Sequence, residues 1–304
     1  MEEKFEPCGV LVIDKPQGMT SHDVVGKVRR LYHTRKVGHT GTLDPMATGV
    51  LVILIGRAAK AAEYLSSDKK GYLATLRLGA AYDTEDITGI ALSKTDIIPD
   101  ESAVRSAING FVGEIKQIPP MYSALKVDGQ KLCDLARKGV EIKREARPVT
   151  IYSIDVKKGE LPTDYILSVR CSSGTYIRTL CANIGASLGC GGAMAALCRT
   201  LAGGFSIENS HTIEEIEALD FDSRAALLIP TEGLFSSLDA VKLSPFYEKL
   251  CRNGCEIYLN KIKADLSLGQ RVRLCSQGGE FFALGEVREY ESGLAIKAIK
   301  LFDV

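Results

Sequence analysis

The amino-acid sequence predicts an α+β protein of about two domains. Its 304 residues are 45% hydrophobic, which is enough to bury a core in each domain. Candidate strands and helices follow one another without the regular β-α-β alternation of a doubly wound sheet. Beyond residue 240, short candidate strands surround Val272, Phe282 and Ile296, so a small β-rich module is expected to close the chain.

The first half of the chain shows clear strand and helix patterns. The apolar run at 9–14 predicts a strand, and Thr20 and Ser21 offer an N-cap for a helix with apolar residues at helical spacing. The elements expected next are a Gly-rich loop at 34–49, a buried strand at 50–55, a short helix at 57–65, an alternating strand at 72–78, a polar turn at 83–89 and a helix from Asp100 to Gly110.

The second half begins where Pro119 and Pro120 interrupt the chain. A basic segment is expected at 126–147, followed by strands at 149–156 and 165–171 and a helix at 176–188. Residues 208–239 contain eight acidic residues and one basic residue, which predicts a solvated connector. Ser244 and Pro245 then predict the start of a helix in the last module.

Charge is balanced overall but unevenly distributed along the chain. The 38 Lys and Arg residues match the 38 Asp and Glu residues, which excludes binding to nucleic acid or anionic lipid by bulk charge. Residues 24–36, however, contain five basic residues and no acidic one, and residues 126–147 contain seven basic and four acidic residues. These segments predict local phosphate contacts and binding that weakens steeply as salt rises.

Several observations favour a reduced, cytoplasmic protein without a metal. The nine cysteines are an odd number without a C-x-x-C pair, and the four histidines show no ligand spacing. The longest apolar run, at 50–55, is far shorter than a membrane helix, and the first residues, MEEKFE, do not resemble a secretory leader. We therefore expect free thiols, no metal and no contact with a membrane.

Common catalytic signatures are missing from the sequence. It contains no G-x-x-x-x-G-K-[ST], no G-x-G-x-x-G and no H-E-x-x-H, which excludes nucleotide hydrolysis, dinucleotide redox chemistry and zinc proteolysis. Ser123-x-x-Lys126 has the spacing of a β-lactamase-type serine site, but the S-D-N and K-T-G companions are missing. We attribute this short pattern to chance.

The most unusual stretch is GHTGTLDPMATG at 38–49, in which three glycines and a proline surround one carboxylate. Pro45 disfavours the α region for Asp44, which favours a carboxylate presented from an extended loop. Alternatively, Asp44 caps a helix with Pro45 at its first position, although Gly49 limits that helix to about one turn. The residues alone leave both interpretations open.

This stretch and several further motifs resemble the TruB family of tRNA pseudouridine synthases. The other motifs follow in the family's order: K-P-x-G-x-T-S at 15–21, K-G-Y at 70–72, T-x-D-x-x-G at 84–89, P-P-x-Y-S-A-x-K at 119–126, S-G-T-Y-I-R at 173–178 and R-T-x-x-G-x-F at 199–205. The resemblance spans residues 9–205. The last residues of the chain resemble the family's small PUA-like module more weakly.

The resemblance implies a pseudouridine synthase catalytic domain at 1–238, built on a mixed and mostly antiparallel sheet. An RNA-clamping insertion at about 120–148 and a PUA-like RNA-binding module at 239–304 complete the implied organisation. The implied reaction flips uridine 55 of the TΨC loop of tRNA out of its stack and isomerises it to pseudouridine. This reaction needs a carboxylate and no cofactor. The implied partner is tRNA, bound through its T-arm stem-loop, and the protein is expected to be a monomer.

The resemblance also implies the site residues. Asp44 is the catalytic carboxylate, Arg178 its ion-pair partner and Tyr176 the base near C5. The implied substrate-binding residues are Tyr72, which stacks on the flipped uracil, His39, Lys15 and Lys126. The sequence does not choose whether Asp44 attacks C1′, stabilises a charged sugar or removes a sugar proton.

From the residues alone, other interpretations of these side chains stay open. Arg178 could be a surface arginine, although a buried aspartate needs a fixed counter-charge to stay ionised. Tyr176 could extend the apolar stripe of its helix, and Tyr72 could be a core residue of its strand. Lys15 is either a turn lysine or a buried support of the catalytic loop, and His39 is either a loop histidine or a substrate contact.

Three other functions compete with the one that the resemblance implies. The chain could act mainly as an RNA-binding folding helper, could depend on a guide RNA within a larger particle, or could be a glycosidase of free nucleosides. The short tail disfavours guide dependence. The basic segments have no purpose in a nucleoside glycosidase.

Overall fold

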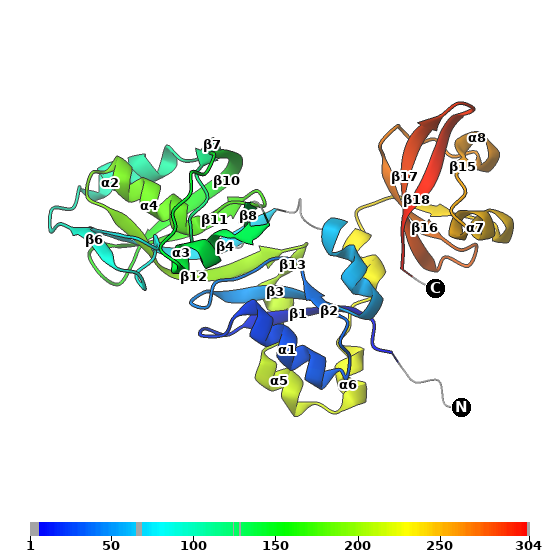
Figure 1. Cartoon of the computed structure of the whole chain (residues 1–304), viewed down its shortest axis with the longest axis horizontal. Coiled ribbons are helices and arrows are strands. Elements are labelled where there is room, and N and C mark those ends of the chain that lie inside the picture. Colours follow the sequence, from blue (N-terminus) through cyan, green and yellow to red (C-terminus); the bar gives the residue numbers. More distant parts are fainter. Residues whose placement is uncertain (1–5, 65–68, 124, 128, 303–304) are drawn as a thin grey trace.

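The computed structural model describes residues 6–64, 69–123, 125–127 and 129–302. These residues form a nine-stranded sheet, a separate five-stranded sheet near the C-terminal end, two short hairpins and the helices between them (Figure 1). Strands and helices mix without a β-α-β repeat, so the α+β prediction is confirmed.

The larger sheet is mixed and mostly antiparallel, as expected. Its strands are, in chain order, β1 (Gly9–Lys15), β2 (Val37–His39), β3 (Thr48–Ile55), β4 (Lys70–Leu78), β7 (Gly113–Gln117), β10 (Arg147–Lys158), β11 (Asp164–Cys171), β12 (Gly192–Ala202) and β13 (Phe205–Ser206). The path across the sheet is β1-β3-β12-β4-β11-β10-β7, with β2 paired to β3 and β13 paired to β12. The β3–β12 pair is parallel, and the other pairs of this sheet within the described residues are antiparallel.

Helices and hairpins connect these strands. The α-helices are α1 (Ser21–Leu31), α2 (Glu101–Asn109), α3 (Leu132–Arg137), α4 (Ile177–Ser187), α5 (Ile213–Ala218), α6 (Phe221–Ala226), α7 (Pro245–Arg252) and α8 (Leu259–Ile262). The 3₁₀-helices are η1 (Gly56–Tyr64), η2 (Ile207–Asn209) and η3 (Thr231–Phe235), and the hairpins pair β5 (Ala80–Tyr82) with β6 (Ala91–Lys94) and β8 (Lys126–Val127) with β9 (Gln130–Lys131). Both predicted N-caps are confirmed: Thr20 caps α1 in a reciprocal capping box with Asp23, and Asp100 caps α2.

Strand β3 shows why its sequence is apolar at successive positions. Leu51 and Ile53 belong to a core cluster formed with α1, α4 and the neighbouring strands. Val50 and Val52 point to the opposite face and belong to a second cluster, which includes residues of η1 and of the C-terminal sheet. A strand that is buried on both faces requires apolar residues throughout, which explains the continuous run at 50–55.

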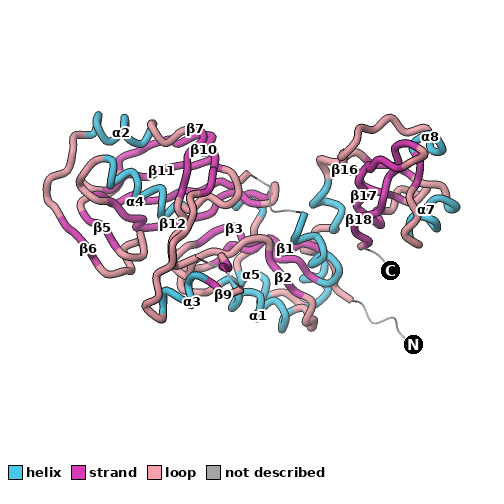
Figure 2. Tube along the Cα trace, turned by 45° about the horizontal axis from the view of Figure 1, so that its top comes forward, coloured by secondary structure: helices cyan, strands magenta, loops and turns pink. Residues whose placement is uncertain are grey.

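The C-terminal module is a five-stranded sheet with α7 and α8 beside it, as Figure 2 shows. Its strands are β14 (Ala240–Lys242), β15 (Ile257–Tyr258), β16 (Arg271–Cys275), β17 (Phe281–Tyr290) and β18 (Gly293–Leu301). Phe235 of η3 contacts Phe281 and Phe302, with ring centroids 5.9 and 5.5 Å apart. The Tyr64 hydroxyl of η1 donates to the Ile299 carbonyl at 3.2 Å. The domain boundary after residue 238 stays a prediction.

The structure corrects three expectations about local structure. Residues 34–49 are not a continuous loop, because β2 lies within them. The helix expected at 57–65 is the 3₁₀-helix η1, and Leu65 lies outside the described residues. Strand β12 was not expected, because its Gly-Ala-Met-Ala-Ala sequence lacks the β-branched and aromatic residues typical of strands.

The acidic segment at 208–239 is not the solvated connector that its charge predicts. Helix α5 buries Ile213 and Ile216 in the main core, and Ile229 pairs with Val10 of β1. Most of the acidic side chains of residues 208–239 are exposed and lie between these buried contacts in the chain. The excess of charge therefore marks the outer face of packed helices.

Apart from Cys133, whose side chain lies outside the described residues, the cysteines are free thiols. Within the residues that the structure describes, no helix combines the length and the apolar character needed to cross a membrane.

Helix α4, which carries Arg178, packs closely against the start of β12. A Cβ atom added at Gly185 lies 2.1 Å from the Gly192 backbone nitrogen, far inside van der Waals contact. We expect Gly185→Ala to destabilise the fold by roughly 2–4 kcal/mol, because backbone on both sides has to move. The matched control is Gly26 of α1, where an added Cβ meets nothing within 4 Å.

Gly26→Ala is expected to stabilise the protein by about 0.5–1 kcal/mol, because alanine favours the helix more than glycine does. Denaturant unfolding measures the free energy of unfolding of both variants. Equal stabilities of the two variants would contradict the proposed close packing of α4 on β12.

Candidate active site

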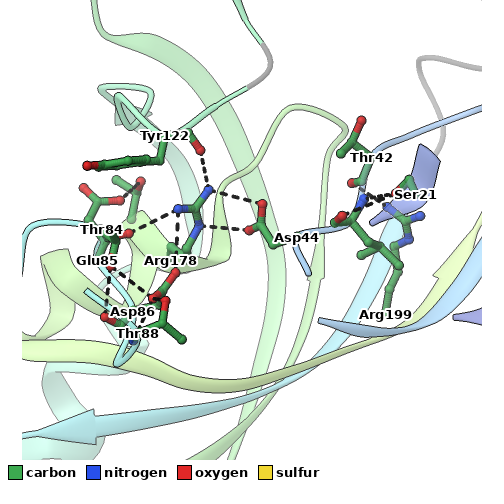
Figure 3. A network of polar contacts seen from close by, with 12 residues as sticks. Ser21, Thr42, Asp44, Thr84, Glu85, Asp86, Thr88, Tyr122, Arg178 and Arg199 are labelled. Carbon is green, nitrogen blue, oxygen red and sulfur yellow. Dashed lines mark hydrogen bonds and ion pairs between the residues drawn. The ribbon is translucent and has the colours of Figure 1, made fainter. Parts of the chain in front are cut away.

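Asp44 and Arg178 face each other as an ion pair (Figure 3). The Arg178 Nε lies 3.0 Å from Asp44 Oδ2, and the Arg178 Nη2 lies 3.5 Å from Asp44 Oδ1. The Arg178 side chain is 7% exposed, whereas the Asp44 side chain is 35% exposed. The guanidinium is therefore held inside the protein, while the carboxylate remains accessible to a ligand.

Arg178 is fixed by groups from two further segments. Its Nη2 donates to the Tyr122 carbonyl at 2.7 Å, and its Nη1 donates to the Thr84 carbonyl at 3.2 Å. Its Nη1 also lies 3.8 Å from Oδ2 of the buried Asp86. Asp86 Oδ1 accepts hydrogen bonds from the Thr88 N–H and hydroxyl at 2.9 and 2.5 Å. One guanidinium thus bridges two carboxylates.

The loop that carries Asp44 contains no helix, so the alternative in which Asp44 caps one is wrong. Ser21 Oγ accepts a hydrogen bond from Leu43 N at 2.9 Å and lies 3.3 Å from the Leu43 carbonyl. On the other side of Asp44, the buried Lys15 Nζ lies 3.4 Å from the Pro45 carbonyl. These contacts fix the backbone immediately before and after the carboxylate.

Arg199 supports the same loop, and sequence patterns did not identify this role. It is 1% exposed, and its guanidinium donates to the carbonyls of Val50 at 2.7 Å and Gly41 at 3.0 Å. β12 approaches β3 so closely that a Cβ at Gly49, where φ is +97°, lies 2.3 Å from the Arg199 carbonyl oxygen. The R-T-x-x-G-x-F motif was the available signal, but it does not reveal that the arginine points inward.

Tyr72 and Tyr176 line a cavity of about 260 Å³ together with Asp44 and Arg178. Tyr72 comes from β4, and Tyr176 is the N-cap residue of α4. The Tyr176 N–H donates to Gln117 Oε1 at 3.0 Å, and its carbonyl accepts from Gln117 Nε2 at 3.2 Å. The structure thus brings four of the predicted site residues together, and the buried Gln117 amide fixes the backbone of one of them.

A second cavity of about 530 Å³ adjoins the same ion pair. Its walls include residues 20–22 at the start of α1 and Arg137 of α3. The residues that line both cavities are Thr42, Leu43, Asp44, Ser123 and Arg178. The ion pair is therefore part of a wall between two spaces.

Two of the other predicted residues, His39 and Lys15, lie away from these walls. His39 lies on β2 and contacts the His22 ring at a centroid distance of 6.0 Å, but it lines neither cavity. Lys15 also lines neither cavity and holds the loop from within the protein. The Lys126 side chain lies outside the described residues. Substrate binding by these three residues stays a prediction.

The surroundings of Asp44 shift its pKa in opposite directions. Burial raises the pKa of Asp44, and the positive charge of Arg178 opposes that rise. Asp86 raises the Asp44 pKa further, and Lys15 lowers it. Arg178 is therefore the main group that favours the ionised carboxylate.

The two tyrosines remain neutral phenols. Burial raises the pKa of Tyr176, and the neighbouring Ser123 hydroxyl opposes the rise. Burial likewise raises the pKa of Tyr72, and the charge of Arg199 opposes it. Both rings therefore meet a ligand as aromatic surfaces with a hydroxyl that can donate a hydrogen bond.

The arrangement suits chemistry on a planar ligand with a reactive carbon or an acidic proton. An accessible carboxylate beside a fixed guanidinium can act as a nucleophile or as a base. Aromatic walls can stack on a planar ring. Among the described residues, no group of three or more His, Cys, Asp or Glu side chains is arranged to hold a metal ion.

Known proteins resemble this chain over nearly its full length. A family profile described as TruB family pseudouridylate synthase (N terminal domain) matches residues 29–177, and one described as tRNA pseudouridylate synthase B C-terminal domain matches residues 178–236. The chain is 45% identical to tRNA pseudouridine synthase B of Alkaliphilus oremlandii, over 96% of this chain and 98% of that protein. It is 43% identical to tRNA pseudouridine synthase B of Clostridium kluyveri, over 97% and 99% of the two chains.

A solved structure shares the fold. The crystal structure of a Cbf5-Nop10-Gar1 complex contains a chain that is 27% identical, with a TM-score of 0.74 over 97% of this chain and 85% of that one. The sequence similarity to these relatives and the structural similarity to this solved chain both extend over nearly the whole length of the protein. The chain belongs to the TruB family of pseudouridylate synthases.

Proposed function

We propose that this chain converts uridine 55 in the TΨC loop of tRNA to pseudouridine in the cavity beside Asp44. The observation that carries the proposal is the Asp44–Arg178 ion pair, which borders a cavity walled by Tyr72 and Tyr176. The names of relatives that are 43–45% identical over nearly the full chain support tRNA as the substrate.

The reaction exchanges one bond of the nucleoside for another. The bond between N1 and C1′ breaks, and a bond between C5 and C1′ forms. The hydrogen on C5 leaves to solvent, and N1 gains a proton, so the reaction is an isomerisation without a redox partner or an energy source. The target base has to leave its stack to reach Asp44, which costs a few kcal/mol.

Asp44 is the catalytic residue in this proposal. Its carboxylate adds to C1′, stabilises a charged sugar or removes a sugar proton, and each of these routes requires the ionised form. Arg178 favours that form and orients the carboxylate through two contacts. A loss of charge at position 44 therefore stops the reaction by any of the three routes.

The two tyrosines are assigned to the uracil base. Tyr72 stacks on the flipped ring, since every base offers a π-face to an aromatic side chain. Tyr176 receives the C5 proton. Because burial keeps this phenol protonated, it accepts a proton only while passing its own hydrogen on, so it acts as a relay.

Two basic segments are assigned to the T-arm phosphates. Helix α1 carries Lys27, Arg29 and Arg30 of the segment at 24–36, and its first residues border the second cavity. The insertion at 120–148 carries the other and contributes Tyr122, Ser123 and Arg137 to the cavity walls. The proposal includes further RNA contacts by the module at 239–304 and a monomer that acts in the cytoplasm.

Tritium release from C5 tests the proposal. A T-arm stem-loop RNA that carries C5-tritiated uridine at the target position is incubated with the protein, and tritium in water and free uracil are both measured. We expect complete release of tritium without free uracil. A stem-loop with the tritiated uridine in its stem is the matched control and is expected to release none.

Two results would overturn the proposed reaction. Free tritiated uracil would identify a glycosidase, because the base would leave without being rejoined to the sugar. Salt-sensitive binding of the RNA without any release would identify an RNA-binding protein that leaves the uridine unchanged.

A further inference from the structure

Ser123 is a buried hydroxyl in the site to which the proposed reaction assigns no role. The residue is 4% exposed, and its Oγ has no hydrogen-bond partner among the described residues. It nevertheless lines both cavities beside the Asp44–Arg178 pair. A buried hydroxyl without a partner destabilises a fold, because its hydrogen bonds to water are lost without replacement. Folding alone therefore does not explain a serine here.

The backbone that leads to Ser123 is held in place by two arginines. The Pro119 carbonyl accepts a hydrogen bond from Arg144 Nη1 at 3.0 Å. The Tyr122 carbonyl, immediately before Ser123, accepts one from Arg178 Nη2 at 2.7 Å. The position of the hydroxyl is thus tied to the guanidinium that pairs with the catalytic aspartate. A polar group fixed in this way before a ligand arrives is suited to recognition.

The neighbours of Ser123 indicate which part of a nucleotide it faces. It lies beside Tyr176, and its hydroxyl opposes the rise in the pKa of that phenol. The cavity between Tyr72 and Tyr176 is assigned to the uracil ring, and Asp44 to C1′. Ser123 therefore borders the ring. A neutral hydroxyl suits a neutral ring carbonyl, whereas phosphates are matched by the basic segments.

We propose that the Ser123 hydroxyl donates a hydrogen bond to a ring carbonyl of the flipped uracil, both before and after the base turns. This inference rests on the proposed function. The uracil turns about the line through N3 and C6. This rotation exchanges N1 with C5 and the C2 carbonyl with the C4 carbonyl. One fixed donor therefore meets a carbonyl oxygen in the substrate and another in the product. Ser123 is a substrate-binding residue that defines both end positions of the ring.

A double-mutant cycle, in which both the enzyme residue and the substrate atom are changed, tests this contact. Single-turnover release of C5 tritium is measured for wild type and Ser123→Ala with stem-loops that carry uridine, 2-thiouridine or 4-thiouridine at the target position. With uridine, Ser123→Ala is expected to slow the reaction roughly 5- to 100-fold, because a buried carbonyl loses its donor. With one of the two thio-substrates, the same change is expected to cost less than about threefold, because sulfur is a weak acceptor from the start.

Ser123→Thr keeps the hydroxyl and is expected to restore the rate on uridine to within about fivefold of wild type. An unchanged rate of Ser123→Ala on uridine, or equal slowing on all three substrates, would overturn the contact with a ring carbonyl. If the wild-type protein releases no tritium from the uridine RNA, the proposed function itself fails. The two failures are therefore distinguishable.

Thermal stability separates a ligand contact from a structural one. Ser21 is the matched comparison, because its buried hydroxyl contacts both the N–H and the carbonyl of Leu43. Ser21→Ala is expected to lower Tm, whereas Ser123→Ala is expected to leave Tm unchanged or to raise it. A fall in Tm for Ser123→Ala as large as that for Ser21→Ala would reveal a structural partner and overturn the proposal.

Discussion

Asp44→Asn is expected to reduce the single-turnover rate of tritium release by at least about 10⁴-fold. The amide has nearly the same shape as the carboxylate and stays within reach of Arg178, so the loop is expected to keep its position. It carries no charge, however, and serves none of the three routes open to the aspartate. Affinity for the T-arm RNA is expected to stay within about threefold of wild type, because the phosphate contacts lie elsewhere.

Rapid-quench tritium release and filter binding measure the two quantities for Asp44→Asn. Asp155→Asn is the matched control, because it removes the same charge from an exposed position of β10. The control is expected to react at the wild-type rate. If Asp44→Asn reacts within about tenfold of wild type, another residue performs the chemistry.

Arg178→Ala is expected to have the second largest effect, a loss of roughly 10²- to 10³-fold in rate at neutral pH. The change leaves Asp44 and Asp86 without the guanidinium that bridges them. It also removes the donor that holds the Tyr122 carbonyl, immediately before Ser123. Loss of orientation and loss of charge stabilisation both reduce the rate.

The pH dependence of Arg178→Ala distinguishes the charge of Arg178 from its other contacts. Burial raises the pKa of Asp44, and Arg178 is the largest influence that lowers it. Without Arg178 the Asp44 pKa rises further, so the carboxylate is protonated over a wider range. Because the ionised form reacts, the acid limb of the rate profile is expected to move to higher pH. Single-turnover rates between about pH 5 and pH 9 measure this shift.

Arg178→Lys is the matched variant for this experiment. It keeps a positive charge but not the planar fork that contacts both oxygens of Asp44. We expect its acid limb to stay close to that of wild type while its rate falls. Coincident acid limbs for Arg178→Ala and wild type would show that Arg178 orients Asp44 without influencing its ionisation.

Elements with a strong local signal were predictable from the sequence. The N-caps at Thr20 and Asp100 and the apolar run at 50–55 each depend on residues that are close together in the chain. Strand β12 has no such signal. Gly192 at its start and the preceding Gly191 allow the close approach of Gly185 in α4, so the identity of these residues reflects a partner outside the strand.

The candidate site also combines residues that the sequence identifies with residues whose role depends on distant parts of the chain. A family resemblance placed Asp44, Tyr72, Tyr176 and Arg178 in one site, and the structure brings them to one cavity. The inward position of Arg199 was not predictable, because the carbonyls that accept its hydrogen bonds belong to another strand and loop. A charged residue is buried only where the fold supplies such partners, and no local pattern reports them.

The Arg178 guanidinium joins the loop of Asp44, the turn at 84–86 and the segment that ends at Ser123. These pieces are far apart in the chain and meet only when the strands between them have assembled. A partly folded chain therefore has an aspartate that is solvated and unremarkable in reactivity. If Asp44 and Arg178 act as proposed, catalytic competence and cooperative folding are coupled at this one side chain, and enzymatic activity reports on the completed fold.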